Sequence, residues 1–145
     1  MSQRIKVLQL QPDYNVKAHD FADLAEQIVK ALPRDRYEVT AAFLRGKPGP
    51  GEAVSRADRS VYFEFSDKSL KGMRLRAMWQ LYKFCRREKF DVVICNRFKP
   101  VNMMLTLNRW LKVPLCIGIS HGFGEYDRFY RRRQTQRLID RHWRF

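Results

Sequence analysis

A histidine followed by two glycines is the segment of this sequence with the clearest chemical potential. His121 comes after an apolar run that ends at Ser120, and Gly122 and Gly124 flank an aromatic residue directly behind it. An imidazole can donate to a hydroxyl or a phosphate, or carry a proton near neutral pH. Glycines let a ligand approach the backbone closely. The segment predicts a ligand-binding loop with His121 as its catalytic candidate, and the alternative is an imidazole that only bonds to backbone at a strand end.

Two further loops place polar and basic side chains behind an apolar run. They span Gln11–His19 and Asn96–Pro100, and the third such loop is His121–Asp127. Ligands of open parallel sheets bind outside the carboxyl ends of the strands, so all three loops are expected at one edge. The predicted substrate-binding residues in these loops are Asn15, Lys17, Asn96, Arg97, Lys99, Gly122, Gly124 and Glu125.

The elements that must position these loops alternate between short apolar runs and amphipathic stretches. The runs predict strands over Ile5–Leu10, Tyr37–Leu44, Val61–Phe65, Asp91–Cys95 and Pro114–Ser120. Apolar spacing of three and four residues predicts helices from Phe21 to Leu32, from Ser66 or Ser69 to Cys85, from Pro100 to Leu111 and from Arg128 to Phe145. This alternation predicts an α/β fold with a doubly wound, mostly parallel, Rossmann-like sheet in three α/β/α layers.

Prolines and terminal aromatic residues set several of the expected boundaries. Pro12 is expected to close the first strand, and Pro33 to stop the first helix. The last predicted helix carries seven arginines and ends in Trp143 and Phe145. Its aromatic end has two interpretations, an exposed surface or a core element separated from its partner strand, and the second is favoured.

Composition places the chain among globular single domains. It has 145 residues, of which 45% are hydrophobic, and it contains no apolar run long enough to span a bilayer. Charges at Arg4 and Lys6 interrupt the first ten residues, so no secretory signal is expected and a cytoplasmic location is predicted. The three cysteines lack metal-type spacing, so we expect reduced, partly buried thiols, with no metal and no cofactor.

Positive charge is concentrated in the second half of the chain. Residues 1–67 hold ten Lys and Arg against ten Asp and Glu, whereas residues 68–145 hold nineteen against five. The net charge of +14 therefore belongs to residues 68–145. Net charge bears on association with polyanions, so a nucleic acid, an anionic membrane surface and a phosphorylated ligand all remain open, beside a basic face that is merely solvated.

Three segments together resemble the N-terminal half of the GT-B glycosyltransferases of the family-4 type. They are Ile5–Leu10 with the helix behind it, Phe90–Arg97, which is similar to that family's F/P-D-V-V-H-x-H strand, and Val113–Gly122, which is similar to its G-V-P-x-V-x-T-x-H-G strand. The resemblance covers most of the chain and implies one Rossmann-like, acceptor-side domain over residues 1–145. In the family, the histidine before the glycine reaches the transferred sugar, and this role carries over to His121.

The resemblance also implies partners. The expected acceptor is an anionic glycan or a lipid-linked molecule of the lipopolysaccharide or cell-envelope type, met at the inner face of the plasma membrane. A nucleotide-sugar would bind only together with the family's C-terminal domain, which does not follow within these residues, so the isolated chain is expected to be inactive. The loop Pro12–His19 also lacks the glycine pair common in the family.

Two alternatives stand beside this interpretation. A basic nucleic-acid-binding protein is the first, because aromatic residues stand among arginines near the carboxyl terminus, as base stacking with phosphate contacts requires. A regulatory partner of a larger transferase is the second.

Overall fold

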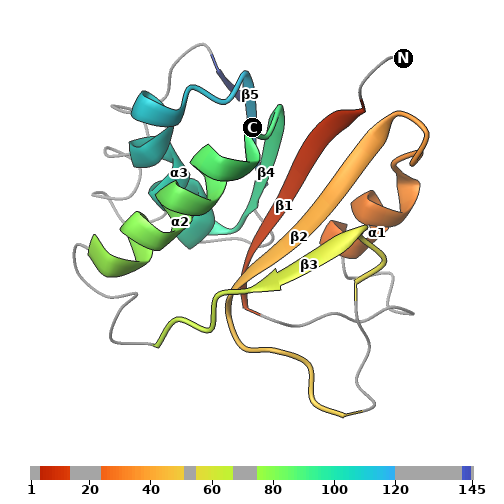
Figure 1. Cartoon of the computed structure of the whole chain (residues 1–145), viewed down its shortest axis with the longest axis horizontal. Coiled ribbons are helices and arrows are strands. Elements are labelled where there is room, and N and C mark those ends of the chain that lie inside the picture. The colour runs from red at the N-terminus through yellow and green to blue at the C-terminus, as the bar shows by residue number, and fades with distance from the viewer. Residues whose placement is uncertain (1–3, 14–23, 51–54, 67–74, 120–141, 145) are drawn as a thin grey trace.

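The computed structural model describes residues 4–13, 24–50, 55–66, 75–119 and 142–144. In chain order the elements are β1 (Ile5–Asp13), α1 (Leu24–Ala31), β2 (Tyr37–Arg45), β3 (Arg59–Tyr62), α2 (Leu75–Glu88), β4 (Val92–Asn96), α3 (Phe98–Leu111), β5 (Leu115–Ile119) and β6 (Trp143–Arg144). The strands pair in parallel in the order β3-β2-β1-β4-β5-β6. Helices α2 and α3 cover one face of the sheet and α1 covers the other (Figure 1). The predicted three-layer α/β fold is confirmed.

Alternation of side chains along the strands divides the core into two layers. Leu8 and Leu10 of β1 belong to the cluster formed with α2 and α3, whereas Val7 belongs to the cluster beneath α1. The central strands β1 and β4 are buried on both faces, which explains their continuous apolar runs. All three cysteines are buried free thiols, as predicted.

β1 and β3 differ from their predicted ranges by more than one residue at one or both ends. β1 continues through Pro12 to Asp13, because beyond Leu10 it no longer pairs with β4 and the missing proline N–H breaks no bond of that ladder. β3 begins at Arg59 and ends at Tyr62, so the expected strand over Val61–Phe65 is wrong at both ends. Glu64 has a positive φ of 54°, which turns the chain out of the strand so that the neighbouring aromatic rings pack toward α2.

The helix boundaries are close to those expected. α1 ends at Ala31, before Pro33, as predicted. α3 begins at Phe98, two residues before Pro100, which therefore lies in the first turn, where a proline costs no intrahelical bond. The predicted starts at Phe21, Ser66 and Ser69 cannot be compared, because residues 14–23 and 67–74 lie outside the described part.

The last predicted helix, from Arg128 to Phe145, is wrong at its carboxyl end. Trp143 and Arg144 form a short parallel strand beside β5, and the Cys116 N–H donates to the His142 carbonyl oxygen at 2.8 Å. The Trp143 side chain is 3% exposed and joins the core under α2 and α3. The core interpretation of this tryptophan is confirmed and the exposed one is wrong, whereas the expected separation from a partner strand is also wrong, because Trp143 pairs with Cys116 of β5. Residues 120–141 and Phe145 lie outside the described residues.

Candidate functional site

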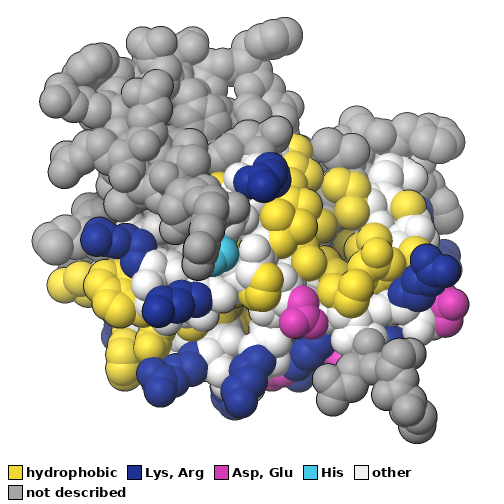
Figure 2. All heavy atoms as spheres, turned by 90° about the horizontal axis from the view of Figure 1, so that it is seen from above, with side chains coloured by type: hydrophobic (Ala, Val, Ile, Leu, Met, Phe, Trp, Pro, Cys, Tyr) yellow, Lys and Arg dark blue, Asp and Glu magenta, His cyan; other side chains and the backbone are white. Residues whose placement is uncertain are grey.

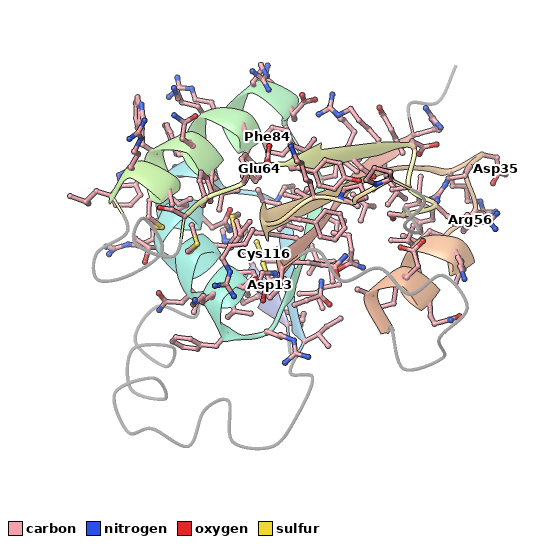
Figure 3. All side chains as sticks on the ribbon, turned by 90° about the horizontal axis from the view of Figure 1, so that it is seen from below. Asp13, Asp35, Arg56, Glu64, Phe84 and Cys116 are labelled. Atoms are coloured by element: carbon pink, nitrogen blue, oxygen red, sulfur yellow. The ribbon has the colours of Figure 1, made fainter. Side chains whose placement is uncertain are left out.

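The strand order reverses direction between β1 and β4. β2 and β3 extend the sheet on one side of β1, whereas β5 and β6 extend it on the far side of β4. In open parallel sheets such a reversal, at the carboxyl ends of the strands, is where ligands bind. The residues at this point are Asp13 at the end of β1, and Asn96 and Arg97 at the end of β4. Figure 3 looks from below and shows Asp13 near this end of the sheet.

Asn96 is buried and holds the end of β4 to β1. Its side chain is 1% exposed, and Nδ2 donates to the Leu10 carbonyl oxygen at 3.0 Å and to Gln9 Oε1. Gln9, itself fully buried, donates through Nε2 to the carbonyl oxygen of Ala25 at 3.3 Å, which reaches α1. These bonds fix the geometry of the strand ends at the candidate site, and a contact between Asn96 and substrate stays a prediction.

Arg97 combines an exposed side chain with an unusual backbone. Its φ of 68° and ψ of 177° lie in a region that is almost reserved for glycine. The conformation is held because the Arg97 N–H donates to the Ile119 carbonyl oxygen at 2.9 Å, which joins the exits of β4 and β5. Holding a non-glycine residue there costs roughly 1–3 kcal/mol, and such costs cluster at binding and catalytic sites.

The start of α3 is electropositive. Arg97 precedes the helix, Lys99 lies in its first turn, and this turn contains no acidic residue. The amino end of a helix already carries partial positive charge and free N–H groups, and two added cations make the potential there more positive. This end of β4 therefore suits a phosphate or carboxylate group.

An ion pair at the ends of β1 and β2 was not among the predicted site residues. Arg45 Nε lies 2.5 Å from Asp13 Oδ1, and both side chains are partly exposed. β1 and β2 are in register at these two residues, which explains why they meet. A sequence signal existed, because Asp13 lies in the predicted ligand loop Gln11–His19 and Arg45 directly follows an apolar strand.

A groove of about 370 Å³ opens between the segment behind β3 and the first turns of α2. It lies near the same edge, because β3 ends there and α2 begins there. The residues that line it are Phe63, Glu64, Phe65, Ser66, Arg76 and Gln80. Sequence reasoning counted Arg76 only among the cations of residues 68–145, because nothing in the pattern indicated a groove.

The remaining predicted site residues lie outside the described part of the chain. They are His121, Asn15, Lys17, Gly122, Gly124 and Glu125. Their roles stay predictions. What the structure establishes is that the chain enters the His121 loop from Ile119, which pairs with Asn96.

Metal ligands and membrane spans were also sought among the described residues. No group of three or more His, Cys, Asp or Glu in this part of the chain is arranged to hold a metal ion. Of the helices described, none has the length and apolar character needed to cross a membrane.

Comparisons with known proteins give a consistent result. Residues 22–145 match the family model of the glycosyl transferase 4-like domain. No curated protein matches the chain. Nine chains of solved structures match, among them a crystal structure at 2.2 Å described as a UDP-N-acetylglucosamine 2-epimerase from Listeria monocytogenes. At 15% identity and a TM-score of 0.60, the match covers 95% of this chain but 38% of the epimerase, and it shows a shared fold.

Proposed function

The chain belongs to the family of glycosyl transferase 4-like domains, and we propose that it is the acceptor-side N-terminal domain of a GT-B glycosyltransferase. In this proposal the whole enzyme moves a sugar from a nucleotide-sugar to an anionic glycan or a lipid-linked acceptor of the cell envelope. The nucleotide-sugar is held mainly by a second domain. The match to 38% of the epimerase supports this division, because that protein extends well beyond the shared fold.

The observation that carries the proposal is the strained, exposed Arg97 at the reversal of strand order. Its guanidinium lies at the edge where such sheets bind ligands, beside the electropositive start of α3. We propose that Arg97 and Lys99 bind an anionic group of the acceptor. His121, in the loop that leaves the neighbouring strand, is proposed to contact the transferring sugar, and Gly122 and Gly124 leave room for it.

Glycine substitution separates a binding role of Arg97 from a structural one. Arg97→Gly removes the unfavourable φ and should raise the melting temperature, while it raises the KM for a phosphorylated acceptor about tenfold or more. Lys112 is a matched control, because it also has a positive φ, 55°, but lies at the opposite end of α3. Lys112→Gly should raise the melting temperature with the KM unchanged, measured on the whole enzyme with a short-chain acceptor and no membrane.

Two results would contradict this role. One is an unchanged KM in Arg97→Gly, and the other is an equal rise in KM for an acceptor that lacks the phosphate.

A separate measurement tests whether the nucleotide-sugar is held mainly by a second domain. Calorimetry of residues 1–145 with UDP- and GDP-sugars should detect no micromolar binding, because in this proposal the second domain holds most of the nucleotide-sugar. Micromolar binding of a nucleotide-sugar by these residues would overturn the proposed division of binding between two domains.

A further inference from the structure

Exposed apolar side chains gather on the outer side of α2 and at the end of α3. Trp79 and Trp110 are 57% and 64% exposed, and Leu75 is 69% exposed. Among the described residues, the remaining large hydrophobic side chain classed as exposed is Ile5, at 40%. Large apolar side chains left in water as a group indicate a binding surface, whereas single ones need no explanation.

Helix geometry brings basic side chains onto the same surface. Trp79, Tyr82, Lys83 and Arg86 are three or four residues apart, so they share one side of α2. Lys83 Nζ lies 5.8 Å from the centre of the Trp79 ring, and Arg86 Nη1 donates to the Tyr82 hydroxyl at 2.8 Å. On α3, the Arg109 guanidinium lies 5.9 Å from the ring centre of Trp110. Each exposed tryptophan therefore has a cation beside it.

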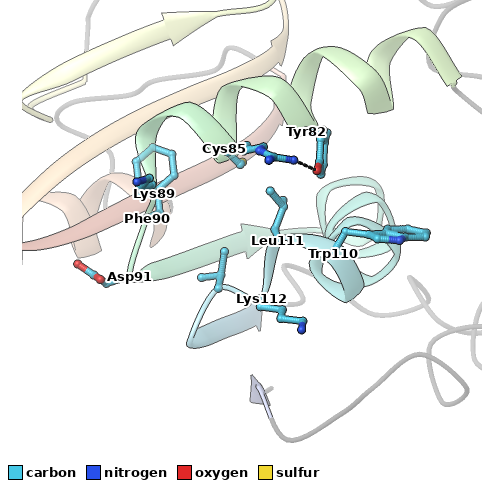
Figure 4. A pocket seen from close by; sticks show the side chains of 10 residues that line it. Tyr82, Cys85, Lys89, Phe90, Asp91, Trp110, Leu111 and Lys112 are labelled. Carbon is cyan, nitrogen blue, oxygen red and sulfur yellow. Dashed lines mark hydrogen bonds between the residues drawn. The ribbon is translucent and has the colours of Figure 1, made fainter.

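A groove joins the two helices. It has a volume of about 460 Å³ and runs between the last turns of α2 and α3 (Figure 4). Tyr82, Trp110 and Lys112 line it together with Arg86 and Lys89. We call this surface the α2–α3 face, and it consists of Leu75, Trp79, Tyr82, Lys83, Arg86, Lys89, Arg109, Trp110 and Lys112.

Two carboxylates belong to this region, Asp91, which itself lines the groove, and Glu88 at the end of α2. Asp91 Oδ2 accepts from the Lys6 N–H of β1 at 2.9 Å. Glu88, the single acidic residue of α2, accepts from Arg59 at 2.7 Å and pairs with Lys6 on the side toward the sheet. On the left of Figure 2, the side on which α2 and α3 lie in Figure 1, hydrophobic side chains stand beside Lys and Arg with no Asp or Glu in view. The five Lys and Arg side chains of the α2–α3 face therefore outnumber its one groove-lining carboxylate, Asp91, and the surface has an excess of positive charge.

We infer that the α2–α3 face docks on an anionic lipid bilayer. Trp and Tyr favour the boundary between headgroups and acyl chains, and Lys and Arg beside them are attracted to anionic headgroups. Leu75 adds a purely apolar contact at the start of α2. A nucleic acid is the weaker occupant, because the Trp79 ring is already stacked on Tyr82, with ring centres 5.8 Å apart and an interplanar angle of 18°, which leaves one face fewer for a base.

Docking through this groove would leave the carboxyl end of the sheet, which carries Arg97, free to bind an acceptor. α2 leads directly into the amino end of β4, and α3 leads into the amino end of β5, so the groove lies at the opposite end of the sheet from Arg97. The inference goes beyond the proposed function, because it concerns a lipid-binding surface and not the acceptor site proposed at Arg97. Vesicle binding without any sugar tests the surface alone, so it can fail while the glycosyltransferase proposal stands.

The experiment is co-sedimentation of residues 1–145 with vesicles of phosphatidylcholine, with or without phosphatidylglycerol. We expect at least a tenfold preference for the anionic vesicles, weakened by salt as the screening length shortens. Two double variants, Trp79→Ala with Trp110→Ala and Lys83→Gln with Arg86→Gln, should each lower this binding about tenfold or more. Lys30→Gln with Arg36→Gln removes the same charge from the α1 side and should leave binding within about twofold.

Several outcomes would overturn the inference. These are equal binding to neutral and anionic vesicles, equal losses in the α1-side control, or unchanged binding in both double variants. Tighter binding to a single-stranded RNA oligomer than to the anionic vesicles would instead assign the surface to nucleic acid. The substituted side chains are mostly exposed, so circular dichroism and thermal unfolding should match the parent. The lipid and salt dependence of the unaltered chain tests the inference even if a variant fails to fold.

Discussion

The two helical layers on the sheet are packed with different chemistry. On the α1 side a carboxylate is buried: Glu26 is 1% exposed and accepts from Ser55 Oγ at 2.8 Å and from the Arg56 N–H at 2.6 Å. On the other side, the buried residues of α2 are Ala77, Leu81, Phe84 and Cys85, none of them charged. In the described part of this layer, the exposed tryptophans lie on the outer surface, and Glu88 is a charged residue of α2 that pairs toward the sheet, with Lys6 and Arg59.

This difference distinguishes the inward-facing side chains, which the fold requires to be mostly apolar, from the outward-facing ones, which it leaves free to vary. A helix in a three-layer domain must bury one apolar stripe against the sheet, and both α1 and α2 do so. The outward side chains are not constrained by this packing. An outer surface rich in tryptophan and cations on one layer is therefore best explained by binding, and the substitutions below test each layer separately.

The largest expected effect distinguishes the inner from the outer side of α2. Phe84 is 5% exposed and packs in the larger core cluster, so Phe84→Ala should cost about 3–5 kcal/mol of unfolding free energy. Trp79→Ala, one and a half turns earlier on the outer side, should change it by less than about 0.5 kcal/mol. Chemical denaturation of both variants measures these two changes in unfolding free energy. A comparable loss in Trp79→Ala would mean that this ring belongs to the core.

The next effect tests the buried carboxylate of the α1 layer. Glu26→Ala leaves the donors of Ser55 and Arg56 without this acceptor, which should cost about 2–3 kcal/mol. The same denaturation experiment applies, and Glu38→Ala, a carboxylate on the nearby strand β2, serves as its control. An unchanged midpoint for Glu26→Ala would show that the α1 layer does not depend on this network.

A smaller effect is expected from Asn96, whose side-chain amide links the end of β4 through Gln9 to the α1 layer. Asn96→Ala removes the bonds to Gln9 and to the Leu10 carbonyl and should cost about 1–2 kcal/mol. If Asn96 is only a positioning residue, the KM for acceptor should change far less in this variant than in Arg97→Gly. A large rise in KM at unchanged stability would place Asn96 in contact with substrate.

The smallest effect depends on pH. The hydrogen bond from Arg59 is the main cause that lowers the pKa of Glu88 below its ordinary value of 4.5. A carboxyl with a lowered folded-state pKa stabilises the protein above its ordinary pKa, and this contribution is lost as the pH falls through the lowered value. Glu88→Gln should therefore lower the melting temperature slightly at pH 7, and the difference should shrink below about pH 4. A difference that is independent of pH would contradict the pairing.

Much of the fold could be predicted because the signals were periodic. β4 and β5 were recognisable as short apolar runs, and the apolar spacing of α2 identified its inner side. β6 could not be recognised, since two residues contain no periodicity and their strand conformation depends on pairing with β5. Tertiary contacts decide such short elements.

The candidate site was only partly predictable. The loop after β4 was identified from its place behind an apolar run, and Arg97 was among its residues. Its glycine-like backbone and the burial of Asn96 had no signal, because both depend on bonds to Ile119 and Gln9, which are distant in sequence. The α2–α3 face was visible only as an excess of charge, since the sequence does not show which tryptophans are exposed.

The central claim is that the α2–α3 face is a binding surface, separate from the acceptor site proposed at Arg97. The most direct measurement is tryptophan fluorescence with anionic vesicles that carry bromine on the acyl chains as a quencher. Trp79 and Trp110 are exposed and Trp143 is buried, so quenching and a blue shift should arise from the first two alone. The variant that retains only Trp143, with Trp79→Phe and Trp110→Phe, should show neither. Equal quenching of Trp143, or none in the unaltered chain, would contradict the account.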